Sequence, residues 1–293
     1  MNGLTIGMVY ALIALGYTMV YGVIQLINFA HGDIFMVGAH LALAVIWLFA
    51  AAFGGAPFWA VLISLLVLSM MGSAVLGAAI EKVAYRPLRG SPRLTALITS
   101  IGVSFFLQNA VMLIYGSKEQ NVPAVIPNIR FEWGPVSFSL MQGIIFLTST
   151  GLMLFLTWFI KNTKLGKAMR ACAENTEAAS LMGVSSGGII RVTFVIGSAL
   201  AAVGGALFGM YYGSINFHDG YLAGLKAFTA AVFGGIGSVP GAMLGGVLLG
   251  VFEGLGAGYL SSEWKDVFAF LLLGAVLIFK PSGMMGENLP DKV

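Results

Sequence analysis

Charged residues are the scarcest class in this sequence. Asp, Glu, Lys and Arg together make up 9% of its 293 residues, whereas soluble globular domains contain about 25%. Apolar residues make up 58%. So few charges cannot cover a globule in water, but they suffice for the loops between membrane helices. The composition therefore excludes a soluble protein and predicts an all-α polytopic membrane protein in a lipid bilayer.

Cysteine and histidine are also rare. Cys172 is the single cysteine, which excludes an internal disulfide framework and a multi-cysteine metal site. The three histidines, His31, His40 and His218, are dispersed, so we expect no metal site and no cofactor. The net charge of the chain is +3, and the Lys and Arg residues are clustered along the sequence. This pattern is typical of cytoplasmic loops rather than of nucleic-acid binding.

Long apolar stretches recur along the chain. A bilayer core of about 30 Å needs roughly 20 helical residues. The first six expected spans are 3–24, 34–53, 58–80, 94–115, 140–160 and 189–212, and shorter apolar segments follow at 221–237, 241–258 and 267–279. The sequence thus predicts one transmembrane bundle over residues 1–293, with about eight or nine spans. Two of the shorter segments are candidates for re-entrant or broken helices.

The distribution of Lys and Arg predicts the orientation of the bundle. Segment 81–93 has four basic residues and one acid, and segment 161–191 has five basic residues and two acids. The loop 116–139 is balanced. Because short loops rich in Lys and Arg stay in the cytoplasm, we expect both basic segments inside and the loop outside. The N-terminus is then outside, and the C-terminus, with Lys280 and Lys292, is inside.

A short pattern occurs twice. Residues 27–33 read Ile-Asn-Phe-Ala-His-Gly-Asp, and residues 215–220 read Ile-Asn-Phe-His-Asp-Gly. Each copy closes a span rich in Gly and Ala and opens another. The predicted orientation places the copies on opposite membrane sides, as in an inverted repeat with broken helices. The alternative is a chance similarity in a biased composition.

The polar breaks in such a repeat are candidates for the solute path or its gate, because their freed backbone groups can bind solute. The side chains that we assign to this role are Asn28, Phe29, His31, Asp33, Asn216 and Phe217. An alternative for Asn28, His31 and Asp33 is that they cap the second span, where an Asp near a helix N-terminus is favoured. Both roles are compatible.

Other small and polar residues lie within the late spans. Gly246, Gly250, Gly254 and Gly258 follow one another at four-residue spacing, which favours close internal helix packing. A moving or dimer-forming helix is the alternative. Lys226 is a candidate partner of Asp219 near the outer mouth. Glu253 fits a helix partner, the cavity or the outer interface. Gln108 and Asn109 fit interhelical hydrogen bonds or the route.

The basic segment 161–187 predicts a short amphipathic helix on the cytoplasmic side. Met169, Cys172, Ala173, Thr176, Ala179 and Leu181-Met182 fall at helical spacing on one face. We expect this helix to end at Gly183. It is too short to span the membrane and too apolar on one face for a linker, so we expect it to dock on something.

Within this segment, Glu177-Ala178-Ala179 followed by Gly183 resembles the EAA loop of ATP-binding cassette (ABC) importer permeases. In that family the loop forms a coupling helix that lies in a groove of the ATPase subunit. The resemblance implies that Glu174, Glu177, Ala178, Ala179 and Gly183 couple this chain to an ATPase. The Pro-containing tail of the wider EAA pattern is absent after Gly183, which leaves the detail of docking open.

The wider chain resembles the LivH-type permeases for branched-chain amino acids. The matching stretches are 11–22, 27–32, 83–87, 170–174 and 226–242. The resemblance implies a permease of the bacterial cytoplasmic (inner) membrane. Its implied partners are a second homologous permease, two ATP-binding cassette ATPase subunits and a periplasmic substrate-binding protein. The sequence has no Gly-x-x-x-x-Gly-Lys-Ser/Thr phosphate loop, so ATP hydrolysis is expected on the partners.

Three alternatives remain for comparison. A permease of this branch could carry urea, short amides or other amino acids, and the sequence discriminates these poorly. An ion-coupled secondary transporter needs coupling charges at mid-membrane, and the nearly charge-free spans disfavour it. An intramembrane enzyme needs a convergent nucleophile–base or metal set, and the scattered histidines and Cys172 provide none. We therefore expect a transport subunit and not an enzyme.

Overall fold

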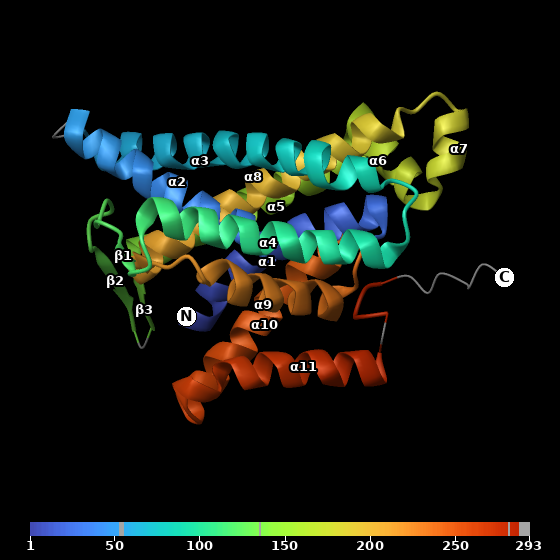
Figure 1. Ribbon diagram of the computed structural model, residues 1–293. Coiled ribbons are helices and arrows are strands. Elements are labelled where there is room, and N and C mark those ends of the chain that lie inside the picture. Colours follow the sequence, from blue (N-terminus) through green and yellow to red (C-terminus); the bar gives the residue numbers. More distant parts are fainter. Residues whose placement is uncertain (53–55, 135, 281, 287–293) are drawn as a thin grey trace.

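The computed structural model describes residues 1–52, 56–134, 136–280 and 282–286. It is a bundle of long helices (Figure 1). The bundle helices are α1 (Asn2–Ile24), α2 (His31–Ala52), α3 (Phe58–Ile80), α4 (Arg93–Tyr115), α5 (Leu140–Asn162), α8 (Ser186–Tyr212), α9 (Asp219–Gly234), α10 (Val239–Tyr259) and α11 (Lys265–Phe279). The predicted all-α polytopic fold is confirmed.

The remaining elements are short and lie at the two ends of the bundle (Figure 1). The short helices and helical turns are η1 (Glu81–Tyr85, a π-helix), η2 (Arg86–Leu88), α6 (Lys164–Glu174), α7 (Thr176–Leu181) and η3 (Ser262–Trp264). The strands are β1 (Gln120–Asn121), β2 (Arg130–Trp133), β3 (Val136–Ser139) and β4 (Ser214–Ile215). Strand β1 pairs antiparallel with β4, and β2 pairs antiparallel with β3.

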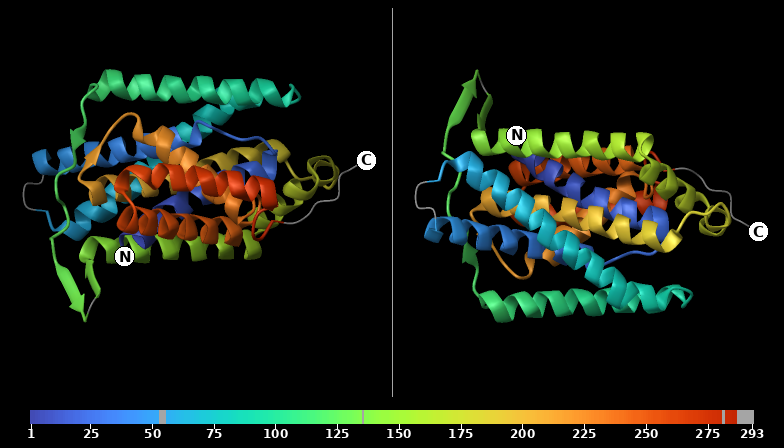
Figure 2. Two further views of the ribbon diagram at one scale, coloured as in Figure 1. Left: turned by 90° about the horizontal axis from the view of Figure 1, so that it is seen from below. Right: turned by 90° about the horizontal axis from the view of Figure 1, so that it is seen from above.

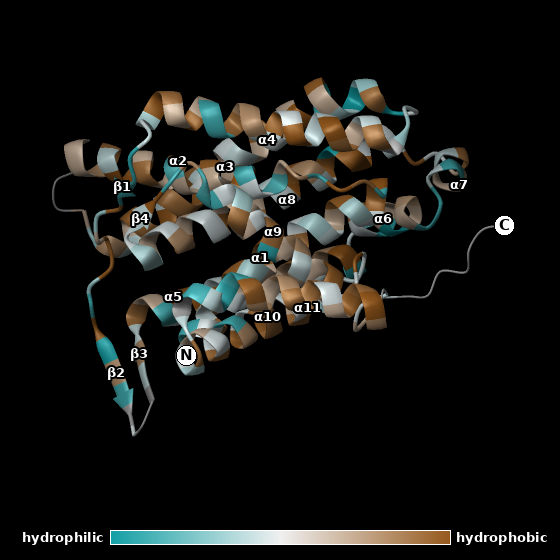
Figure 3. Ribbon diagram, turned by 60° about the horizontal axis from the view of Figure 1, so that its bottom comes forward, coloured by the Kyte–Doolittle hydropathy of each residue, from teal (hydrophilic) through white to brown (hydrophobic). Residues whose placement is uncertain are grey.

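Seven helices in the described residues are long and apolar enough to cross a membrane: α1, α2, α3, α4, α5, α8 and α10. Figure 3 shows their mainly hydrophobic colouring. Helices α9, with 16 residues, and α11, with 15 residues, are shorter. The predicted short segment 241–258 is instead the full-length helix α10, with 21 residues. The predicted end of the second span, Phe53, lies outside the described residues.

The two ends of the bundle differ in charge. We call the end with η1, η2, α6 and α7 the basic end, and the end with the four strands the hairpin end (Figure 1). Arg89 and Arg191, one from each predicted basic segment, both pair with Glu81. Both segments therefore lie at the same end, as the predicted topology requires. Lys280 directly follows α11, whereas Lys292 lies outside the described residues.

The helix contacts have the symmetry of an inverted repeat, with α1, α2 and α3 corresponding to α8, α9 and α10. Helix α1 packs on α10, and α8 packs on α3. Helix α2 packs on α3 and α8, and α9 packs on α10 and α1. The two symmetry-related pairs, α1 with α8 and α2 with α9, also meet. Each of the contacts named here thus has its counterpart among them.

The segment between α1 and α2 runs back into the bundle, so that α2 begins in the interior (Figure 2). The ring of His31, at the start of α2, lies 4.7 Å from the ring of Tyr17, about two helical turns before α1 ends. A Cβ added at Gly16 would overlap the His31 ring. Helix α9 also begins in the interior, because Gly32 of α2 contacts the backbone of Gly220. The N-termini of these two re-entrant helices meet.

Small residues allow a close helix crossing between α1 and α10. Cβ atoms added at Gly246, Gly250 and Gly254 would overlap the backbone of Ala11, Gly7 and Gly3 of α1, respectively. At Gly258, an added Cβ has no heavy atom of the described residues within 4 Å apart from its own helix backbone and chain neighbours. Three of the four spaced glycines therefore serve internal packing, where van der Waals contact replaces the missing hydrophobic drive.

We expect Gly250→Ala to destabilise the bundle by about 1–3 kcal/mol, because the methyl group forces α1 and α10 apart. The matched control is Gly258→Ala on the same helix, which we expect to be neutral or to stabilise by up to about 1 kcal/mol through helix propensity. The thermal unfolding midpoint in mild detergent measures both. Equal midpoints for the two variants would contradict the crossing.

Candidate translocation and coupling sites

Asn28 organises the first break. Its side chain is buried, and its Oδ1 accepts hydrogen bonds from the backbone N–H of Ala30 at 3.1 Å and from the hydroxyl of Tyr85 at 2.8 Å. Its carbonyl accepts from the backbone N–H of His31 at 3.1 Å. Asn28 therefore closes the turn that starts α2 and ties it to η1 at the basic end.

Asn216 makes the same turn in the second break. Its Oδ1 accepts from the backbone N–H of His218 at 3.1 Å, and its carbonyl accepts from the N–H of Asp219 at 3.2 Å. The Asp219 carboxylate in turn accepts from the Asn216 N–H at 2.7 Å. The repeated sequence pattern therefore encodes a repeated local structure, in which an Asn side chain satisfies a backbone donor ahead of each helix.

Asp33 lies where the two re-entrant helices meet. It is 1% exposed and belongs to the first turn of α2. Its Oδ1 accepts from Gln108 Nε2 of α4 at 3.0 Å, and its own backbone lies against Gly220 of α9. Its Oδ2 is buried without a hydrogen-bond partner among the described residues. The carboxylate is thus at the N-terminal turns of both helices, whose dipoles favour negative charge.

Gln108 has the interhelical role that was one of its two predicted alternatives. It bonds to Asp33 and also to the hydroxyl of Ser104, one turn earlier on α4, at 3.2 Å. Asn109 instead donates to the backbone carbonyl of Phe105 on its own helix at 2.7 Å. Helix α4, at the periphery of the bundle, is therefore attached to the start of α2 through the polar side chain of Gln108.

The aromatic residues around the first break leave little free space. Phe29 lies 6.2 Å from Phe228, which lies 6.1 Å from Tyr17. Beside them is a cavity of about 10 Å³, lined by Tyr17, Tyr21, Ile27, Phe228, Ala231 and Ile236. Such a cavity holds about one water molecule, and it is too small for a leucine side chain. In this arrangement the first break is closed.

The six predicted path residues divide into two groups. Asn28, His31 and Asp33 are buried in the interior, and Phe29 is half-buried beside them. Asn216 and Phe217 lie half-buried on the segment that leads into α9, where Phe217 stacks near His218 at 4.1 Å. The structure brings the groups together through Gly32 and Gly220 rather than through the predicted side chains.

Lys226 pairs with other residues than predicted. Its Nζ lies 2.7 Å from Glu253 Oε1 of α10 and 2.6 Å from Asp266 Oδ1 of α11, and the Tyr10 ring lies 5.8 Å away. Asp219, the expected partner, caps its own turn instead. Lys226 and Glu253 are 5% and 4% exposed. This cluster holds α9, α10 and α11 together near the hairpin end. Of the roles expected for Glu253, the structure shows the pairing with a neighbouring helix.

The coupling segment contains two helices, which corrects the prediction of one. Asn175 separates α6 from α7, and its side chain caps α7 by accepting from the backbone N–H groups of Glu177 and Ala178, both at 3.0 Å. An Asn in this position favours a new helix start. Helix α7 closes with Gly183 at φ +84°, a left-handed cap as predicted.

The predicted apolar stripe of this segment is also divided. Met169, Cys172 and Ala179 are buried against the bundle. Leu181 and Met182 are 89% and 85% exposed at the tip of the basic end. Of the predicted coupling residues, Glu174, Glu177, Ala178 and Gly183 are exposed, whereas Ala179 is not free for a partner. One part of the stripe therefore holds the segment in place and the other presents an apolar tip.

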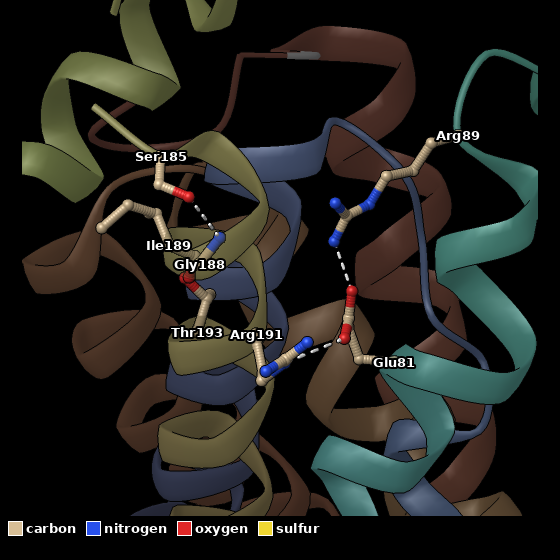
Figure 4. Close-up of polar contacts among 7 residues, drawn as sticks. All are labelled: Glu81, Arg89, Ser185, Gly188, Ile189, Arg191 and Thr193. Carbon is tan, nitrogen blue, oxygen red and sulfur yellow. Dashed lines mark hydrogen bonds and ion pairs between the residues drawn. The ribbon is translucent and has the colours of Figure 1, made fainter. Parts of the chain in front are cut away.

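In the sequence, Glu81 stands out only as the single acid of the basic segment 81–93. Its side chain is fully buried at the start of η1, where Arg89 donates to Oε1 and Arg191 Nε lies 3.5 Å from Oε2 (Figure 4). The available signal was its position directly after a run of 47 residues, 34–80, without any charge. An acid at such a boundary beside several arginines indicates a paired carboxylate.

Comparison with known proteins gives matches over most or all of the chain. Residues 1–277 match the family model of the branched-chain amino acid transport system permease component. The chain is 51% identical over 298 residues to the high-affinity branched-chain amino acid transport system permease protein BraD of Pseudomonas aeruginosa, covering 100% of this chain and 96% of BraD. It is 46% identical over 297 residues to the corresponding protein LivH of Escherichia coli K12, covering 100% and 96%. A probable branched-chain amino acid transport permease protein LivH of Methanocaldococcus jannaschii is 28% identical over 293 residues, with 94% and 88% covered.

We expect Lys226→Met to destabilise the protein by about 3 kcal/mol, because it leaves the buried Glu253 and the partly buried Asp266 without their cation. The control is Lys161→Met at the exposed end of α5, which we expect to change stability by less than about 0.5 kcal/mol. Thermal unfolding in mild detergent measures both. A Lys226→Met variant as stable as the control would contradict a structural role for the cluster.

Proposed function

The chain belongs to the family of branched-chain amino acid transport system permease components, and we propose that it forms part of the membrane path of an ATP-driven importer for leucine, isoleucine and valine. It is a transport subunit and not an enzyme. The observation that carries the substrate class is the similarity of the whole chain to BraD and LivH, which are named for branched-chain amino acids. Its place is the bacterial cytoplasmic membrane, with the basic end inside.

The exposed tip of α7 supports an ATPase partner at the basic end. Leu181 and Met182 are almost fully exposed, and burying two such side chains is favourable by about 1.5–3 kcal/mol each. An ATP-binding cassette subunit that takes this tip into a groove accounts for their exposure. We assign Glu174, Glu177, Ala178 and Gly183 to the rim of this contact. The complex then contains two ATPase subunits, one for each permease.

The closed first break supports a second, homologous permease. The cavity of about 10 Å³ beside Tyr17 and Phe228 does not admit an amino acid. A path that a second permease completes needs no wide channel inside this chain alone. A periplasmic binding protein that docks at the hairpin end completes the proposed assembly, since it delivers the substrate.

The meeting point of α2 and α9 is the proposed gate. A substrate amino acid carries a carboxylate and an ammonium group. The N-terminal turns of the two re-entrant helices attract the carboxylate, and Asp33 attracts the ammonium group. Phe29 and Phe217 present apolar surface at the two breaks, while Asn28, His31 and Asn216 hold the turns. This arrangement favours passage of a zwitterion with an apolar side chain over a charged solute.

The proposed function is tested by purification from the native membrane in mild detergent, with the partners identified by mass spectrometry. We expect a second permease, ATPase subunits and a binding protein. The purified complex is then reconstituted in vesicles with ATP on the side of the basic end, and uptake of leucine is compared with uptake of urea and acetamide. ATP-dependent uptake of urea or acetamide without leucine would refute the substrate class. Recovery of the chain alone in several detergents would refute the assembly.

We expect Gly183→Pro to abolish ATP-dependent uptake and to weaken ATPase association, while membrane insertion is unchanged. Proline cannot adopt φ +84° and removes the N–H that bonds to Ser180 at 3.0 Å, so Leu181 and Met182 are displaced. The matched control is Gly116→Pro, which replaces a left-handed cap at φ +91° at the hairpin end, bonded to Met112 at 2.9 Å. Normal uptake by Gly183→Pro, or equal losses in both variants, would refute the coupling contact.

A further inference from the structure

A buried carboxylate connects the coupling segment to α3. Arg191 lies in the second turn of α8, which directly follows the segment after α7, and its Nε lies 3.5 Å from Glu81 Oε2 (Figure 4). Arg89, from the opposite side, bonds to the other oxygen of Glu81. The carboxylate thus joins the start of α8 to the turn that ends α3.

The coupling segment is itself held on α8. Both α6 and α7 pack on α8. Ser185 caps α8 by accepting from the backbone N–H of Gly188 at 3.4 Å (Figure 4), and Gly183 closes α7 two residues earlier. Because only these few residues separate α7 from α8, a displacement of α7 moves the start of α8 and with it Arg191.

Tyr85 continues the connection from η1 to the first break. It lies four residues after Glu81 on the same π-helix, is 5% exposed, and donates its hydroxyl to Asn28 Oδ1 at 2.8 Å. Its ring packs on Phe194 of α8 at 5.0 Å, one helical turn after Arg191. Turn η1 therefore contacts α8 through both Glu81 and Tyr85, and it contacts the first break through Tyr85. Short π-helices of this kind occur frequently at functional sites.

The energetics of Glu81 favour a positioning role over a stabilising one. Removing a carboxylate from water is expensive, and paired arginines offset this only when the geometry is good. A well-packed apolar residue gives comparable stability without that requirement. What the charged cluster adds is a defined position of η1 relative to α8, because Glu81 has to remain between its two arginines.

We propose that Glu81 and Tyr85 form a relay that passes movement of the coupling segment to Asn28 and thereby sets the position of the start of α2. The relay rests on the proposed function, because it requires α7 to contact an ATPase and the first break to gate the path. Glu81, Tyr85 and Arg191 are positioning residues in this relay, since they act on the gate through Asn28.

The first test is Tyr85→Phe, which keeps the ring against Phe194 and removes only the hydroxyl bonded to Asn28. In the reconstituted complex, the number of leucine molecules imported per ATP hydrolysed is measured. We expect this ratio to fall by about twofold or more, because mutations along a coupling network change the coupling at least by about that factor. ATP hydrolysis stimulated by the binding protein is expected to continue. A purely structural hydroxyl lowers the amount of active complex but leaves the ratio unchanged.

The matched control is Tyr115→Phe. The hydroxyl of Tyr115, on α4 toward the hairpin end, donates to the backbone carbonyl of His40 at 3.2 Å. The control therefore loses one comparable tyrosine hydrogen bond away from the relay. We expect similar unfolding midpoints for both variants and a lowered ratio for Tyr85→Phe alone. An unchanged ratio in Tyr85→Phe, or the same fall in both variants, would overturn the relay.

A double variant tests whether Arg191 and Tyr85 act in one relay. The Arg191 side chain is 50% exposed, against 36% for Arg89, so we expect Arg191→Gln to disturb folding less than a change at Arg89. If the two residues act in series, Arg191→Gln combined with Tyr85→Phe lowers the ratio no further than the more severe single variant. Multiplied losses in the double variant would show independent effects and would overturn the relay.

The unmodified complex separates the two proposals. If it hydrolyses ATP in response to the binding protein but imports no leucine, isoleucine or valine, the proposed function fails and the relay fails with it. If it imports leucine and Tyr85→Phe imports it at the same ratio to ATP, the proposed function stands and the relay alone is refuted.

Discussion

The requirement that every backbone polar group be satisfied away from water governs this fold. In a bilayer, an interrupted helix is tolerated only where protein or a water-filled cavity covers the exposed N–H and carbonyl groups. The chain interrupts two helices and covers both breaks in the same way. Asn28 and Asn216 each satisfy a donor of their own turn, and neighbouring helices bury Asn28 and leave Asn216 half-buried. The inverted repeat uses this one solution twice, with opposite direction.

Close approach of backbones makes that solution possible. Two re-entrant helices can meet end to end only if their first turns carry almost no side chain, and Gly32 and Gly220 provide this at the centre. The same property recurs where α1 crosses α10, at Gly7 and Gly250. Lipid gives no hydrophobic drive for such crossings, so the contact area itself has to hold the helices. The glycine content of the late spans is therefore a packing requirement of the repeat.

The sequence predicts the features that depend on local chemistry and composition. The apolar stretches, the repeated Ile-Asn-Phe pattern and the cap at Gly183 are all found where they are expected, because span length, turn residues and helix ends are encoded locally. The pairing of charges is not encoded locally. Lys226 meets Glu253 and Asp266 only because α9, α10 and α11 become neighbours, and Ala179 is buried only because α7 packs on α8. Asn175 is an intermediate case, since its capping preference predicts a helix start that an amphipathic pattern alone conceals.

Some polar groups at the centre of the bundle are already engaged with one another, although Asn28 Nδ2, His31 Nε2 and Asp33 Oδ2 have no partner among the described residues. One oxygen of Asp33 accepts from Gln108, and Asn28 accepts from Tyr85. A solute that passes this point has to compete with these bonds and gains little net free energy from replacing them. Weak binding of this kind suits a path, because a tightly bound amino acid leaves slowly. In the proposed function, affinity for the substrate comes from a separate binding protein, and the direction of transport comes from an ATPase partner that opens and closes the proposed gate. The chemistry of the breaks therefore argues for a chain that works only as one subunit of a larger machine.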